Sequence, residues 1–186
     1  MRQTAKGFTL IELLIVIAVL GILAVAVLSA INPIEQIDRG KDTASRSDAE
    51  QILGGMERFY TNNGYYVWRP DTSLGTDALA WTKVTNAWND GTTAVLTKLS
   101  AGVVGVSTGE LKTSFVTRVV GAKYNPLWVY NKGAQGDSTY VCFKPLSAAL
   151  STEATTRCAA KPADYPASAC ANTTNCGTAG NCICLP

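Results

Sequence analysis

The side chains that could perform chemistry in this 186-residue chain are few and unevenly placed. There is no histidine, which removes the commonest general base, the Ser-His and Cys-His nucleophile pairs and any histidine-ligated metal site. What remains is one carboxylate, Glu12, inside an apolar run, and six cysteines, namely Cys142, Cys158, Cys170, Cys176, Cys182 and Cys184. The elements that hold these two groups decide what they can do.

The apolar run predicts a membrane-spanning helix. Phe8 to Ile31 comprises 24 residues whose only charge is Glu12. At ~1.5 Å per residue such a helix is about 36 Å long and crosses a ~30 Å hydrocarbon core. Arg2 and Lys6 precede it, which predicts a cytoplasmic amino end and an exported remainder. A charge within a membrane helix costs roughly 2.5 kcal/mol or more, less near the interface, so Glu12 indicates a function.

Two simpler interpretations of the run remain open. It could be a secretory signal peptide cut near Ser29, although the apolar core of such a peptide is about 7–15 residues long and this one carries an acid. It could also be a plain signal anchor in which Glu12 reaches the lipid head groups.

The residues Gly7, Phe8, Thr9, Leu10 and Glu12, followed by the apolar run, resemble the class III signal of type IV prepilins and pseudopilins. The resemblance implies that prepilin peptidase cuts between Gly7 and Phe8 and methylates the new Phe8 amine. It also implies that Glu12 pairs with the Phe8 amine of a neighbouring subunit during fibre assembly. The cut would leave 14 basic residues against 14 acidic ones, so the mature subunit would carry no net side-chain charge to repel its copies.

A second, amphipathic helix is predicted over 32–63. Asn32-Pro33 disfavours helix before the proline, and Gly64 supplies a left-handed stop after residue 63. Its expected core-facing stripe recurs at spacings of three or four and comprises Ile34, Ile37, Lys41, Ala44, Asp48, Ile52, Met56 and Phe59.

Gly21 and Pro33 soften the two helices. Members of the resembled family often place a proline inside the apolar segment, where the helix is thought to melt in the fibre. Pro33 lies beyond that segment, so the position of any melted stretch stays open. Gly21 could equally serve close packing between membrane helices.

The body predicts a small antiparallel sheet packed on the second half of the helix. Strand composition occurs at Phe115–Val120, Leu127–Asn131 and Thr139–Lys144, with residues 132–137 as a hairpin loop. Residues 65–89 indicate a long connection with one short helix. The aromatic residues are expected to form the core rather than a ligand platform.

The tail, 146–186, has too few large apolar residues to pack alone and contains five of the six cysteines. In an exported chain these predict up to three disulfides, with 15 connectivities possible. A cysteine-only zinc site is the alternative, but the chain lacks a Cys-x-x-Cys pair. Major pseudopilins bind calcium near the carboxyl end, whereas the acids here form no ligand-spaced loop, so we expect no metal and no cofactor. By the resemblance, this region would decorate the fibre surface.

The predicted fold class is α+β, with a long amino-terminal helix packed on a small antiparallel sheet and a disulfide-stapled carboxyl-terminal region. The expected organisation is a leader at 1–7, a transmembrane and fibre-core helix at 8–31, its amphipathic continuation at 32–63, a globular head at 64–145 and the cysteine-rich region at 146–186.

The main functional hypothesis is a type IV pilin, a structural subunit that is not an enzyme and polymerises into an extracellular fibre for adhesion, motility or DNA uptake. Its expected partners are other copies of itself, prepilin peptidase, the pilus assembly platform and, before assembly, cytoplasmic-membrane lipid. The formal charge of +2 and the lack of a basic cluster argue against nucleic acid. The alternatives are a pseudopilin of a type II secretion system and a membrane-anchored extracytoplasmic enzyme.

Overall fold

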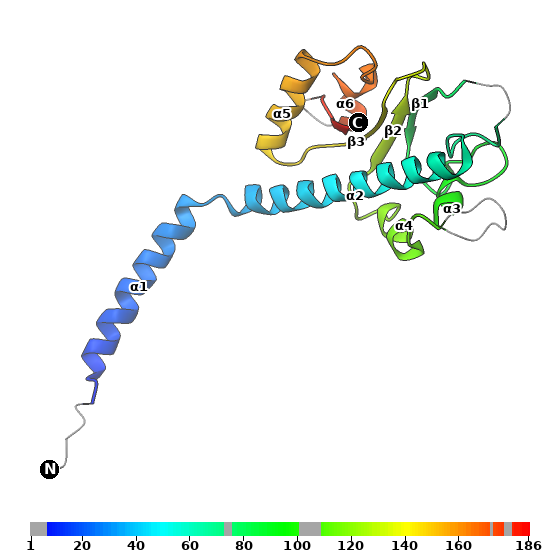
Figure 1. Ribbon diagram of the computed structural model, residues 1–186. Coiled ribbons are helices and arrows are strands. Elements are labelled where there is room, and N and C mark those ends of the chain that lie inside the picture. The colour runs from blue at the N-terminus through cyan, green and yellow to red at the C-terminus, as the bar shows by residue number, and fades with distance from the viewer. Residues whose placement is uncertain (1–6, 73–75, 101–108, 172, 177–179) are drawn as a thin grey trace. The chain divides into compact units, whose positions relative to one another are not determined.

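The computed structural model describes residues 7–72, 76–100, 109–171, 173–176 and 180–186. The chain divides into two compact units, Met1–Ile37 and Asp38–Pro186, which are described separately. The fold is α+β, as predicted: helices with one four-stranded antiparallel sheet (Figure 1).

The first unit contains helix α1, Leu10–Ala30. Its segment Leu10–Ser29 has a mean hydropathy of 3.1 and none of it is buried, so by length and composition it can cross a membrane. The helix ends where Ile31 turns extended, with φ −102° and ψ 130°. The Asn32 side chain then accepts the backbone N–H groups of Ile34 and Glu35 at 3.2 and 3.4 Å, which caps the start of the next helix at Pro33. The Asn-Pro dipeptide therefore marks a real break between the two helices.

Helix α2 runs from Pro33 to Asn63 and stops, as predicted, at Gly64, whose φ is +76°. The predicted core stripe is correct in its second half and wrong in its first. Lys41 and Ala44 are exposed, and Ile34 and Ile37 are 69% and 59% exposed. The residues that α2 buries are Asp42, Ser45, Asp48, Ala49, Ile52, Leu53, Gly55, Met56 and Phe59.

The polar start of that buried face has a specific cause. The carboxylate of Asp42 accepts the backbone N–H groups of Leu146 and Ser147 at 2.8 Å each and the Ser147 hydroxyl at 2.6 Å. Ser147 in turn caps helix α5, Ala148–Ala159. A buried carboxylate is tolerated because three donors satisfy it, so this part of α2 holds the start of the tail by hydrogen bonds rather than by apolar contact.

The sheet has the strand order β1-β2-β3-β4, with every neighbouring pair antiparallel. Strands β2, Leu127–Asn131, and β3, Thr139–Phe143, form the predicted hairpin. Strands β1, Leu79–Lys83, and β4, Ile183–Leu185, lie in segments predicted as a connection and as a loop-rich tail. The three residues of β4 are too few for an alternating pattern, and β1 contains no fully buried residue that would mark one of its faces.

The strand predicted at Phe115–Val120 is wrong, because the segment forms helix α4, Thr113–Val119. Phe115, Val116 and Val119 are all buried, and Val119 follows the other two by four and three residues, the spacings that place side chains on one side of a helix. Arg118 holds α4 on α2 by a bidentate ion pair: its two terminal nitrogens donate to the two carboxylate oxygens of Asp48, at 2.6 and 3.0 Å. The β-branched residues of this segment favour a strand, but the helical spacing of its buried apolar residues decides the structure.

Two cores lie on the two faces of the sheet. In Figure 1, α2 crosses one face, with α3 (Val95–Ser100) and α4 along it. Ile52 and Phe59 of α2 share this main core with Val141 and Phe143 of β3. The alternate β3 residues, Tyr140 and Cys142, point to a smaller core with the other tail cysteines. That second core also holds the 3-10 turn Ala167–Ala169 and helix α6, Thr173–Cys176.

A buried ion pair fixes the connection before α3. The Lys98 ammonium contacts the Asp90 carboxylate, and neither side chain is more than 2% exposed. Lys98 also donates to the backbone carbonyl of Arg69 at 2.8 Å. Burial alone would raise the pKa of Asp90, but Lys98 and the N–H groups of Thr92 and Thr93 hold it well below its ordinary value. The stabilisation from this carboxylate is therefore present at neutral pH and lost only as the pH falls through the lowered pKa.

We expect Lys98→Met to destabilise the protein by about 3–5 kcal/mol, because it leaves the Asp90 carboxylate buried without its cation. Denaturant unfolding of the full chain in detergent, followed by tryptophan fluorescence, measures this change. Lys83→Met is the matched control, since Lys83 is exposed. Equal stability of the two variants would contradict the assignment.

Candidate functional site

The amino-terminal site is built on the first turn of α1. Thr9 is the N-cap residue, and its backbone N–H and hydroxyl both donate to Oε2 of Glu12, at 2.9 and 2.7 Å. The Glu12 backbone N–H donates back to the Thr9 hydroxyl at 3.3 Å. This reciprocal capping box holds the carboxylate at the helix start, where the helix dipole favours a negative charge.

The arrangement leaves the carboxylate positioned and accessible. Both Thr9 bonds go to Oε2, and among the described residues no hydrogen bond to Oε1 is found. Phe8, directly before the cap, is 85% exposed. A cation such as an amine can therefore approach Oε1 while Oε2 stays fixed. Sequence reasoning missed this role of Thr9, although the Thr-x-x-Glu spacing is itself the signature of a capping box.

The other residues considered in the helices take different places. Gly7 has open space around it. Gly21 lies in the unbroken interior of α1, and a Cβ there would meet nothing within 4 Å. Pro33 is the first residue of α2, where its missing N–H costs no hydrogen bond.

All six cysteines are paired, and the predicted disulfide-stapled tail is confirmed. The bond between Cys142 and Cys184 joins directly paired residues of β3 and β4. The other two bonds, inside the tail, are Cys158–Cys170 and Cys176–Cys182. No thiolate is left for zinc, and the described residues contain no cluster of metal-ligating side chains.

Polar contacts add to the disulfides in holding the tail on the sheet. Asp164 accepts the Ser138 N–H at 2.9 Å and the Tyr140 hydroxyl at 3.1 Å. Burial and the neighbouring Asp164 carboxylate raise the pKa of Tyr140 to about 12, so the hydroxyl stays protonated and donates. The Ser138 bond in turn lowers the pKa of Asp164.

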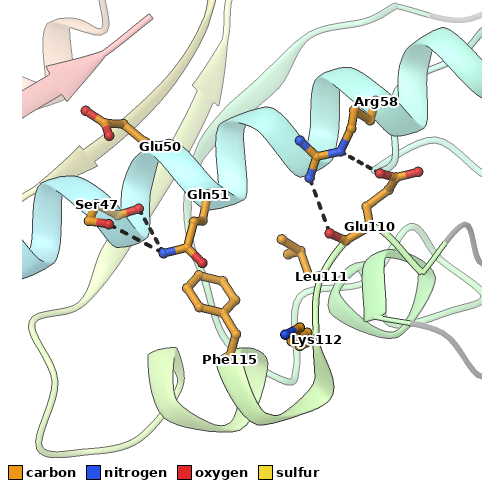
Figure 2. Close-up of a pocket in the computed structure, with 8 residues that line it drawn as sticks. All are labelled: Ser47, Glu50, Gln51, Arg58, Glu110, Leu111, Lys112 and Phe115. Atoms are coloured by element: carbon orange, nitrogen blue, oxygen red, sulfur yellow. Dashed lines mark hydrogen bonds and ion pairs between the residues drawn. The ribbon is translucent and has the colours of Figure 1, made fainter.

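The head also contains a cavity of about 490 Å³ between α2 and α4. Figure 2 shows Arg58 of α2 reaching across it to Glu110, with the two side chains 2.6 Å apart and Arg58 also 3.2 Å from the Glu110 carbonyl. The other lining residues are Ser47, Glu50, Gln51, Leu111, Lys112 and Phe115. No cysteine or histidine is among the described residues that line this cavity, and Arg58 and Glu110 form an ion pair with each other. We therefore interpret the cavity as a gap between packed elements rather than as a catalytic site.

Comparison with known proteins finds relatives for both the amino terminus and the head. Residues 2–28 match the family model described as the prokaryotic N-terminal methylation motif. The chain is 31% identical to fimbrial protein EcpC of Eikenella corrodens over 141 residues, covering 75% of this chain and 82% of that protein. It is also 31% identical to the type IV major pilin protein PilE of Neisseria gonorrhoeae over 148 residues, 79% of each chain.

A shorter match links the chain to a secretion protein. The type II secretion system core protein G of Pseudomonas aeruginosa is 33% identical over 78 residues, 42% of this chain and 51% of that protein. No solved structure matches. The Thr9–Glu12 cap on an apolar helix, the four-stranded head with its stapled tail and the matches across most of the chain agree: the chain belongs to the type IV pilin and pseudopilin family.

Proposed function

We propose that this chain is a pilin, a structural subunit that polymerises into an extracellular fibre. The observation that carries the proposal is the extent of the two pilin-type matches, 141 and 148 residues, which run through the head as well as the helix. The named relatives are a fimbrial protein, a pilin and a secretion core protein, which supports a structural role over an enzymatic one.

The proposed maturation begins at the leader. Prepilin peptidase cuts the chain after Gly7, which removes residues 1–7, and then methylates the Phe8 amine on the cytoplasmic side. Until assembly, segment 8–31 anchors the subunit in the cytoplasmic membrane, with 32–63, the head 64–145 and the tail 146–186 exported. The match to the methylation motif and the exposure of Phe8 support this order.

The proposed assembly step uses the capping box. The assembly platform delivers a subunit, and the Phe8 amine of one copy pairs with the open Oε1 of Glu12 in its neighbour, while Thr9 keeps Oε2 in place. Each charge lowers the cost of the other in lipid, so pairing occurs only in the correct axial register. Gly21 and Pro33 are the proposed points at which the helices adjust to packing.

A pseudopilin is the second candidate, and the match to the secretion core protein favours it. That match covers about half of the relative, whereas the pilin-type matches cover about four fifths of theirs. Recovery of long extracellular filaments that contain this chain would decide for the pilin, and short envelope-bound assemblies would decide for the pseudopilin.

Processing is tested by intact-mass and amino-terminal mass spectrometry of the exported protein. We expect the chain to begin at Phe8 and to be one methyl group heavier than the unmodified form. Gly7→Val should retain the leader, because the larger side chain occupies the proposed cut site, while Gln3→Ala should be processed normally. An intact Met1, or a start near Ser29, would overturn the maturation scheme.

A further inference from the structure

One groove in the head combines exposed apolar and cationic side chains. A cavity of about 410 Å³ lies beside the first half of α2 and includes Tyr124 and Leu146, which are 46% and 38% exposed. Among the described residues after Ile37, Tyr60 is the only other large hydrophobic side chain exposed to this degree. A smaller cavity of about 160 Å³ also contains Tyr124. The two cavities share Tyr124 as a lining residue, and Lys83 lines the smaller one. We call the surface on both sides of Tyr124 the lysine-rimmed groove, defined by Lys41, Lys83, Lys123, Tyr124 and Leu146.

The groove presents positive charge to solvent. Its one acid, Asp48, is buried and bound by Arg118. Lys41 lies 3.1 Å from Asp38 of the same helix, an exposed pair that is worth little. Lys83 and Lys123 are exposed and form no ion pair with any described residue. The groove therefore suits a partner that carries carboxylates.

The opposite charge lies on the solvent side of α2. Residues of this side recur at spacings of three and four, and we call them the acidic face: Ser47, Glu50, Gly54, Glu57 and Thr61. The carboxylates of Glu50 and Glu57 are exposed and have no partner among the described residues. They stand about 10 Å apart along one side of the helix, at ~1.5 Å per residue. Figure 2 shows the Glu50 side chain directed away from Leu111 and Phe115, and the residue is exposed.

We infer that the acidic face of one subunit docks on the lysine-rimmed groove of another, which gives the fibre a contact outside the membrane helix. The inference rests on the proposed polymerisation. Both surfaces lie in the unit Asp38–Pro186, so every copy carries one of each. A contact between two different surfaces of identical chains is open-ended and generates a filament rather than a closed dimer.

The charges give the inference its specificity. With 14 basic and 14 acidic side chains after removal of the leader, the mature subunit has no net charge to drive association. Complementary patches then decide which surfaces meet, since like charges placed together at an interface are strongly unfavourable.

The test reverses the charge of each patch in the full chain. The groove variant is Lys83→Glu with Lys123→Glu, and the face variant is Glu50→Lys with Glu57→Lys. Each expressed alone should lower the yield of sheared filaments about five-fold or more, because both patches then carry the same sign. Expressed together, the two variants should recover filaments in which they alternate, since each then offers the charge that the other needs.

Two controls separate this inference from the proposed function. Lys161→Glu, an exposed lysine of the tail, should assemble like the unaltered chain. Failure of the unaltered chain to form any filament would contradict the proposed function itself. Normal filament yield from either variant alone would overturn the docking, and so would loss without recovery on co-expression, the result expected if an anionic lipid surface or another protein occupies the groove.

Carbodiimide cross-linking of the unaltered filaments gives an independent measurement. This reagent joins an amine to a carboxylate in direct contact, so we expect Lys83 or Lys123 linked to Glu50 or Glu57. Filaments grown from isotopically light and heavy subunits should show mixed-label peptides, which identify the link as intermolecular. Cross-links within one chain only would contradict the contact.

Discussion

Glu12→Gln is expected to abolish most filament assembly, with a yield at least about ten-fold lower, while the protein still inserts in the membrane and loses its leader. Glutamine has nearly the same shape and keeps an oxygen for Thr9, so the helix start should form as before. It lacks the charge that pairs with the amine of a neighbouring Phe8. A charge-assisted hydrogen bond is worth about 1.5–3 kcal/mol, and the fibre repeats this bond at every subunit.

The measurement compares filament yield with the amount of processed subunit in the membrane. Thr9→Val is a companion variant, because it removes the hydroxyl of the cap but keeps the Glu12 charge. It should assemble better than Glu12→Gln and worse than the unaltered chain, since the carboxylate is present but less firmly held. Unaltered yield from Glu12→Gln would show that the carboxylate serves only as a helix cap.

Removal of the Cys142–Cys184 disulfide, as Cys142→Ala with Cys184→Ala, is expected to cost about 4 kcal/mol of the free energy of unfolding. The bond spans a sequence separation of 42 residues, and closing a loop of that size removes about this much chain entropy from the unfolded state. The loss should release β4, a strand of three residues at the edge of the sheet, next to β3. The second core on that face should then open as well.

The pair Cys176→Ala with Cys182→Ala is the matched control. Its separation is six residues, for which the same relation gives only about 2 kcal/mol. Denaturant unfolding under non-reducing conditions compares the free energies of unfolding of the two double variants. Limited proteolysis of the two folded variants shows in which of them the tail has been released. A smaller effect from Cys142–Cys184 than from Cys176–Cys182 would mean that β4 is held chiefly by its other contacts.

Several elements could be predicted because their signals are local. The apolar helix, the break at Asn32-Pro33 and the stop at Gly64 depend on properties that each segment carries by itself. The β2–β3 hairpin belongs to the same group, since its two strands are separated by only seven residues.

The errors fall where a distant contact decides the structure. Residues Phe115–Val120 have strand composition but form a helix, because Arg118 and three apolar side chains find partners in the head. Asp42 is not part of the predicted core-facing stripe, yet it is buried. Its carboxylate accepts hydrogen bonds from the backbone N–H groups of Leu146 and Ser147, about a hundred residues away. The strand β4 exists only because β3 provides an edge to which it can pair.

The sequence by itself determined the apolar helix and the single carboxylate, Glu12, at its start, both fixed by residue type and spacing within about 25 positions. The cut after Gly7 and the free Phe8 amine belong to the proposed function. The sequence also showed that six cysteines in an exported chain would pair, but not in which of the possible ways. Only the tertiary structure decided the pairing of the cysteines and separated the acidic face from the lysine-rimmed groove. The physical reason is that helix signals act over a few residues, whereas disulfides, sheet edges and surface patches depend on segments that meet only after the chain has folded.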